Sequence, residues 1–157
     1  MIQSGKFDSS NMDIKKIANL TLNFLINRLI EIFGIFILIF GIVLFVALVT
    51  YSPNDPNFIF PEGTEIKNLL GFHGSYTADF FFQSFGFISY LIPITYFFTG
   101  LNIFKKKEIF IIISNTFFIV PYTVIGSVFF DFFYTNAFEL YINGNGGFVG
   151  NYFNNKN

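Results

Sequence analysis

Three long stretches of this chain are apolar, and polar or charged residues gather between them. The stretches cover residues 32–50, 79–104 and 109–130, and the one charged side chain among them is Asp79, at the start of the second. A bilayer core about 30 Å thick requires about 20 consecutive apolar residues in a helix. The pattern therefore predicts an all-α membrane protein with three transmembrane helices.

The second apolar stretch carries a helix-start signal and an internal proline. Ser75 and Thr77 are residue types that cap helix N-termini, so we expect Asp79 in the first turn, exposed at the membrane interface. The competing interpretation makes Asp79 a functional acid at the mouth of the span. Pro93, near the middle of the stretch, removes one helical hydrogen bond and predicts a kink.

Residues 1–31 precede the first stretch and are more polar. Within this segment, residues 14–30 repeat apolar positions at three- and four-residue steps, which is typical of an amphipathic helix. The repeat fits a helix lying on the membrane surface and a helical extension of the first span equally well.

Three polar connections complete the predicted organisation. Residues 51–78 hold several prolines and glycines and predict a loop outside the membrane. Residues 105–108 form a very short turn. Residues 131–157 predict an irregular external segment rich in asparagine and glycine, leading towards a fourth span.

Basic residues are distributed unevenly and set the expected orientation. Lys105, Lys106 and Lys107 lie between the second and third stretches, and most other cations precede the first stretch. Cytoplasmic connections are enriched in lysine and arginine, so both segments are placed in the cytoplasm. We therefore expect a multi-pass protein of the bacterial cytoplasmic (inner) membrane with a cytoplasmic N-terminus.

Composition narrows the chemistry that the chain can perform. Of its 157 residues, 53% are hydrophobic and 12% are charged, whereas a soluble domain has about 25% charged residues. There is no cysteine and one histidine, His73, which we interpret as a polar loop residue. We expect no metal, cofactor or catalytic residue in this chain.

The glycine-rich part of the last segment, residues 143–150, is not a Walker A phosphate loop. Such a loop requires a lysine followed by serine or threonine after its last glycine. Asn151 and Tyr152 stand in those places. The chain is therefore not expected to hydrolyse ATP by itself.

Small residues in the apolar stretches are candidates for close helix packing and for association between copies. They are Gly34, Gly41, Gly86 and Gly100. Helices in lipid approach closely where small residues line the contact, although glycines can also face lipid. Asn115, the strongly polar residue inside the third stretch, is expected to face a neighbouring helix.

Two other function classes, a structural or transporter subunit and a membrane enzyme, can be compared with the residues of the spans. A small multi-span membrane protein acting as a structural or transporter subunit is the alternative, but a transport path requires polar or charged residues inside the membrane, and the spans hold few. A membrane enzyme requires grouped acids or histidines. Asp79 and Asp131 lie on the same predicted side, without a third partner.

Several motifs, in order, resemble the N-terminal membrane domain of FtsK/SpoIIIE-type DNA translocases. The first span opens with Glu31-Ile-Phe-Gly34 and is followed by Tyr51-Ser-Pro-Asn-Asp-Pro56, similar to the family's Tyr-Ser-x-x-Asp-Pro motif. Tyr90-Leu-Ile-Pro93 and Gly146-Gly-Phe-Val-Gly150 resemble later family motifs. The loop positions that carry the resemblance are Tyr51, Ser52, Asp55, Pro56, Asn68, Gly71, Gly74 and Asp79.

The resemblance implies a domain of four transmembrane helices with both termini in the cytoplasm. Such a domain anchors and helps to oligomerise a hexameric, ATP-driven DNA pump at the division septum, for cell division and chromosome segregation. It implies a homo-oligomer, division proteins as partners, and DNA, ATP and Mg²⁺ bound only by the motor. Because the fourth span and the motor are missing, we expect this chain to be a piece of a longer protein; a natural short form is the alternative.

Overall fold

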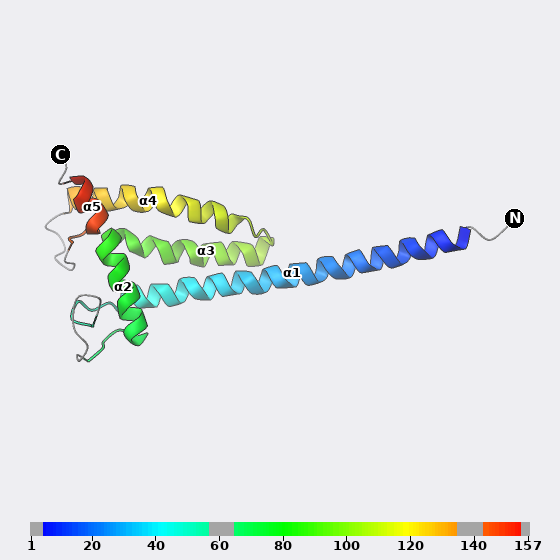
Figure 1. Ribbon diagram of the computed structural model, residues 1–157, viewed down its shortest axis with the longest axis horizontal. Helices are drawn as coiled ribbons and strands as arrows, with labels where there is room; N and C mark the ends of the chain where they lie inside the picture. Colours follow the sequence, from blue (N-terminus) through cyan, green and yellow to red (C-terminus); the bar gives the residue numbers. More distant parts are fainter. Residues whose placement is uncertain (1–4, 57–64, 135–142, 155–157) are drawn as a thin grey trace.

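The computed structural model describes residues 5–56, 65–134 and 143–154, with side chains from residue 13 onward. Within those ranges it is helical and contains no strand. The elements in chain order are α1 (Gly5–Val49), α2 (Gly71–Phe85), the 3-10 helix η1 (Gly86–Tyr90), α3 (Leu91–Lys106), α4 (Ile111–Phe133) and α5 (Gly147–Asn154). Figure 1 shows α1, α3 and α4 side by side, with α2 running across one end of α1.

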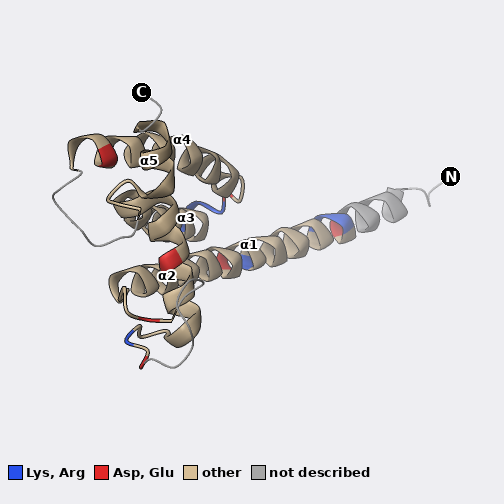
Figure 2. Cartoon of the chain, turned by 60° about the vertical axis from the view of Figure 1, so that its left-hand side comes forward, with Lys and Arg blue, Asp and Glu red and all other residues tan. Residues whose placement is uncertain are grey.

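Three segments in the described part of the chain are long and apolar enough to cross a membrane, as the sequence predicts. They are Asp13–Val49, Gly71–Lys106 and Ile111–Phe133. Figure 2 shows that most of α4 is free of charged residues, and α3 carries charge only in its last turn, at Lys105 and Lys106, as the interior of a bilayer demands. The protein is thus an all-α membrane protein.

Helix α1 runs without interruption from Gly5 to Val49. The amphipathic segment 14–30 and the predicted span 32–50 therefore form one rod, because no proline separates them and their apolar positions share one helical repeat. Its 45 residues correspond to roughly 67 Å at about 1.5 Å per residue, twice the bilayer core. The first half extends beyond the other helices (Figure 1).

The predicted span 79–104 is divided among α2, η1 and α3 rather than forming one continuous α-helix. The break lies at Gly86, whose φ of 69° ends α2 and starts η1. Pro93, expected to kink the span at its middle, instead lies in the first turn of α3. A proline is tolerated there because the first N–H groups of a helix have no intrahelical partner. Helix α4, in contrast, continues through Pro121.

Glycines allow α1 and α3 to lie against each other. A Cβ atom at Gly34 would lie 2.7 Å from the backbone nitrogen of Phe104, and one at Gly41 would lie 2.6 Å from that of Phe97. Gly100 faces the backbone of Leu38 in the same way. Side chains at these positions would push the helices apart, so this packing depends on the three glycines.

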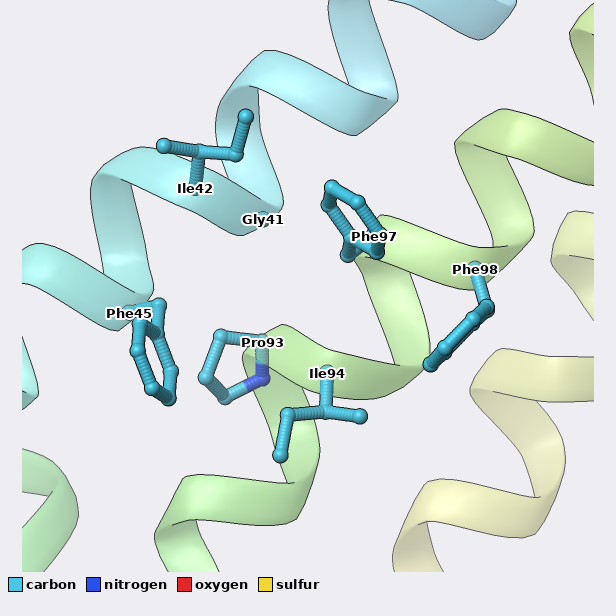
Figure 3. A pocket seen from close by; sticks show the side chains of 7 residues that line it. All are labelled: Gly41, Ile42, Phe45, Pro93, Ile94, Phe97 and Phe98. Atoms are coloured by element: carbon cyan, nitrogen blue, oxygen red, sulfur yellow. The ribbon is translucent and has the colours of Figure 1, made fainter.

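An apolar groove of about 400 Å³ follows the same helix pair. Figure 3 shows it between α1 and α3, where Gly41 and Pro93 leave space beside larger apolar side chains. The residues that line it are Gly41, Ile42, Phe45, Pro93, Ile94, Phe97 and Phe98. None of them offers a charged or hydrogen-bonding side chain, so the groove provides no catalytic chemistry.

Candidate functional site

The polar residues that sequence reasoning selected gather at the end of the bundle where α1 ends and α2 begins. Asp55 lies at the centre of this region, and only 1% of its surface is exposed. Its Oδ1 accepts a hydrogen bond from the backbone N–H of Lys67 and its Oδ2 one from Asn68, both at 2.9 Å. A carboxylate that binds two backbone N–H groups joins the two arms of the 51–70 connection.

Asn68 links this carboxylate to both helices. Its Nδ2 donates to the carbonyl oxygen of Ala47 in α1 at 2.9 Å, and its Oδ1 accepts from the N–H of Leu70 at 3.0 Å. Gly74 packs directly on the Asn68 amide, where a Cβ atom would clash. The Asn68 side chain therefore fixes the start of α2 against the end of α1.

Three further residues support the same corner. Ser75 Oγ donates to the carbonyl oxygen of Pro56 at 3.1 Å. Gly71 begins α2 with a φ of 64°, a left-handed conformation that favours glycine. Ser52 contributes its backbone carbonyl, which accepts from the N–H of Asp55 at 3.1 Å. We call the group Asp55, Pro56, Asn68, Gly74 and Ser75 the loop clamp.

Asp79 is not an exposed first-turn residue, which corrects the preferred interpretation of the sequence. Helix α2 begins at Gly71, earlier than Ser75 and Thr77 suggested, so Asp79 lies in its third turn, facing inward. It is 3% exposed. Tyr51 donates its OH to Asp79 Oδ1 at 3.0 Å, and Gln83 Nε2 lies 3.5 Å from the same oxygen. Gly71, Gly74 and Asp79 are thus helical, not loop, positions.

Burial and the neighbouring carboxylate change the acidity of Tyr51. Partial burial, followed by the charge of Asp79 and the hydrogen bond to it, raises the pKa of the Tyr51 phenol above its usual range. Tyr51 therefore remains a neutral donor at physiological pH. Its ring also packs on Phe82, with ring centroids 5.0 Å apart, in the small apolar core beneath the clamp.

The network continues from Asp79 to the last segment of the chain. Asn143 Nδ2 donates to Gln83 Oε1 at 3.0 Å. Hydrogen bonds therefore connect the residues that follow α1, helix α2 and the segment before α5, through Tyr51, Asp79, Gln83 and Asn143. We call these four residues the Asp79 hydrogen-bond chain. It joins parts of the sequence that are more than 90 residues apart.

Two left-handed glycines face each other where α2 meets the last segment. Gly86 has a φ of 69° and Gly147 a φ of 62°. A Cβ atom on Gly147 would lie 2.6 Å from the backbone nitrogens of Gly86 and Phe85. The N–H of Phe87 donates to the carbonyl oxygen of Asn145 at 2.9 Å. Gly86, expected to pack helices, therefore contacts a loop rather than a helix face.

The Gly146-to-Gly150 motif, predicted to be part of an irregular external segment, opens α5 and packs on α4. Both glycines lie on the backbone of Ser127 and on Asp131, where Cβ atoms would clash. Ser127 Oγ donates to Phe85 O at 3.0 Å, and Asn154 Nδ2 donates to Asp131 Oδ2 at 2.9 Å. Residues 135–142 and 155–157 of that segment lie outside the described residues.

Sequence reasoning missed Ser127 and did not find the role of Asp131. A signal was present: Thr123, Ser127 and Asp131 recur every four residues in an otherwise apolar helix, so they share one face. All three are buried. Such a stripe predicts a polar contact surface inside the protein rather than lipid exposure.

Asn115 and the lysines at 105–107 lie away from this end, whereas His73 lies in the first turn of α2 and not in a loop, as the sequence had predicted. Asn115 Nδ2 donates to Thr99 Oγ1 at 2.7 Å, so it does face a neighbouring helix. His73 is exposed and contacts Phe72. Lys107 Nζ lies 3.0 Å from Glu31 Oε1, which ties the α3–α4 turn to α1. The described residues hold no group of three acids or histidines able to bind a metal ion.

The arrangement can hold helices together, because its side chains pack and hydrogen bond between them. Three membrane-length helical segments and an interlocked polar end define a multi-span helical membrane domain. The family model of the 4TM region of DNA translocase FtsK/SpoIIIE matches residues 27–156. The chain therefore belongs to this family.

Several curated relatives agree with the family match. The chain is 38% identical over 69 residues to DNA translocase FtsK of Rickettsia bellii, covering 44% of this chain and 9% of the relative. It is 32% identical over 82 residues to that of Rickettsia prowazekii, covering 50% and 11%. The match to that of Azospirillum brasilense is 32% over 88 residues, covering 55% and 14%. The chain thus spans about a tenth of the length of these relatives, and no solved structure matches it.

Proposed function

We propose that this chain is the membrane anchor of a septal DNA translocase that acts in cell division and chromosome segregation. The observation that carries the proposal is the family match over residues 27–156, which includes all three membrane-length segments. The relatives are named DNA translocases, and the matched part is their membrane region. In this proposal ATP, Mg²⁺ and DNA bind to a motor outside these 157 residues.

The physical contribution of the chain to this function is a rigid attachment. The loop clamp, the Asp79 hydrogen-bond chain and the hydrogen bond from Asn154 to Asp131 hold α1, α2, α4 and α5 together at one end, so force applied to the chain is shared among several helices. A load on one helix alone would have to be resisted by that helix and its lipid contacts. Hydrogen bonds and packing between several helices therefore suit a membrane domain that has to withstand the force of an attached motor.

The proposed orientation places the N-terminus and the lysines at 105–107, which lie at the end of α3 and not in a separate turn, in the cytoplasm of a bacterium. Its support is the uneven distribution of lysine and arginine. The loop clamp then lies on the outer side. The protein is proposed to form a homo-oligomer, hexameric by family resemblance, and to meet division proteins at the septum.

Association between copies would use faces other than the predicted glycines. Gly34, Gly41 and Gly100 are occupied in the α1–α3 contact within one chain. The apolar faces of α1 and α4 that remain exposed in one copy are available instead, for example at Phe36 and Phe117, which are 68% and 71% exposed.

A localisation experiment tests the proposal. The chain is fused at its N-terminus to a fluorescent protein and expressed in dividing bacteria, next to a three-span membrane protein of unrelated sequence carrying the same label. We expect enrichment of this chain at the septum relative to the control. Equal distribution of both proteins around the membrane would contradict the septal role.

A further inference from the structure

The turn between α3 and α4 borders a cavity that anchoring by apolar spans does not require. The cavity measures about 680 Å³. It lies between α1 and the turn, and it is lined by Ile30, by residues 107–111 and by Ser114. Figure 1 shows the turn beside the middle of α1, where the apolar half of that helix begins. The cavity is therefore at one edge of the membrane-spanning part.

The walls of the cavity combine apolar and polar groups. Ile30, Ile109, Phe110 and Ile111 supply an apolar surface, and the ring of Phe110 is 77% exposed. Ser114 adds a hydroxyl group from the first turn of α4. An apolar wall with a polar rim at the membrane edge matches the junction between the acyl chains and the headgroup of a phospholipid.

The charge around the cavity selects one kind of headgroup. Lys105 and Lys106 are exposed in the last turn of α3, directly before the lining residue Lys107, and no carboxylate among the described residues forms a salt bridge with either. The one carboxylate in the lining is Glu108. Lys107 is held by Glu31 at 3.0 Å. Lysine side chains at a membrane edge extend their ammonium groups to the headgroup level, where they attract anionic lipids.

We propose that this cavity binds an anionic phospholipid. Lys105 and Lys106 bind the lipid phosphate and the headgroup charge, Ser114 contacts the polar backbone of the lipid, and Ile30 and Phe110 contact the first part of its acyl chains. The ion pair between Lys107 and Glu31 keeps the turn attached to α1 and so keeps the cavity walls in place. The inference goes beyond the proposed anchoring of a motor and does not depend on it.

Native mass spectrometry of the full chain in detergent tests the proposal without any influence of membrane orientation. Phosphatidylglycerol and phosphatidylcholine are titrated separately, and bound lipid is counted. We expect phosphatidylglycerol to bind more tightly. The double variant Lys105→Gln, Lys106→Gln should lose about 25-fold in phosphatidylglycerol affinity, roughly fivefold for each lysine removed.

The matched control is the pair Lys15→Gln, Lys16→Gln, which removes the same charge from an exposed part of α1 far from the turn. We expect less than a twofold effect. An equal loss in both double variants would overturn the proposal, because general attraction would then explain the binding. Equal affinity for both lipids in the unchanged chain would overturn it as well.

Three single variants separate the effect of the cavity from that of charge. Ser114→Trp fills the cavity and should lower phosphatidylglycerol affinity several-fold, while Thr116→Trp, exposed outside the cavity on the same helix, should leave it unchanged. Glu108→Gln removes a negative charge from the lining and should raise the affinity. Unchanged binding in Ser114→Trp would place the lipid elsewhere and refute the assignment.

Discussion

Replacing Asp55 with alanine should destabilise the loop-clamp end of the protein more than any other single change in the loop. The substitution removes both acceptors of the Lys67 and Asn68 backbone N–H groups, each bound at 2.9 Å. A hydrogen bond to a charged group contributes about 1.5–3 kcal/mol. Since the Asn68 bond is buried and the Lys67 bond is partly exposed, we expect a loss of about 3–5 kcal/mol for the pair.

Two measurements check this value. Unfolding in mixed micelles at increasing fraction of denaturing detergent, followed by circular dichroism, gives the change in unfolding free energy. Amide hydrogen exchange at Lys67 and Asn68 reports the two bonds directly. Asp55→Asn keeps one acceptor oxygen and should lose about half as much. Glu65→Gln, exposed in the same loop, is the control and should change stability by less than about 0.5 kcal/mol.

One pattern of results would refute the proposed role of the Asp55 carboxylate in closing the loop. If Asp55→Ala changes the unfolding free energy no more than Glu65→Gln, and the amides of Lys67 and Asn68 exchange at unchanged rates, then the carboxylate does not close the loop. The motif position would then need an explanation outside folding, such as contact with an external partner.

Further predictions concern the close contacts and the buried phenol. Gly41→Leu should cost about 2 kcal/mol or more by forcing α1 from α3, whereas Ile42→Leu on the lipid-facing groove should be close to neutral in the same unfolding assay. Gly147→Ala should destabilise more than Gly144→Ala, because both have positive φ but only Gly147 faces backbone at 2.6 Å; equal losses would contradict the packing argument. The raised pKa of Tyr51 means that its contribution is fully present below its ordinary pKa of 10.0 and is lost as pH rises through the folded value. Stability of the unchanged chain should therefore fall more steeply above pH 10 than that of Tyr51→Phe, and parallel curves would contradict this. A periplasmic reporter inserted after Pro56 should be active, and a cytoplasmic reporter at the same place inactive; the reverse would overturn the orientation.

The membrane-spanning part of the fold is predictable because it follows from composition over long windows. An uncharged run of about 20 residues has few alternatives to a membrane helix. The same reasoning placed Asn115 against a neighbouring helix, and it lies within 2.7 Å of Thr99. Local chemistry was sufficient there because lipid offers a polar group no other partner.

The loop-clamp end was less predictable because its structure depends on contacts between distant segments. Ser75 and Thr77 have the chemistry of capping residues, yet the Asn68 contacts start α2 at Gly71 and bury Asp79. The sequence predicted a bend at Pro93, but the helix breaks at Gly86, where the backbone of Asn145 lies close to the backbone of Gly86. In both places a partner far along the chain outweighs the local preference.

The fold gives the family motifs a physical explanation. Asp55, Asn68 and Asp79 are each buried and hydrogen bonded at one end of the bundle. The glycines at 146 and 150 permit α5 to lie on Ser127 and Asp131. In this chain these residues pack and hydrogen bond between helices, which is consistent with an anchor.

The central proposal is that this chain anchors a DNA translocase, and the most direct test is to read the coding frame beyond the codon for Asn157 in the source genome. The result is paired with an immunoblot of source cells using an antibody to residues 13–30. The proposal predicts a frame that continues into a fourth apolar run, a linker and a Gly-x-x-x-x-Gly-Lys-Ser or -Thr loop, with a polypeptide several times larger than 18.0 kDa. A stop codon directly after Asn157, with a single band at 18.0 kDa, would contradict it.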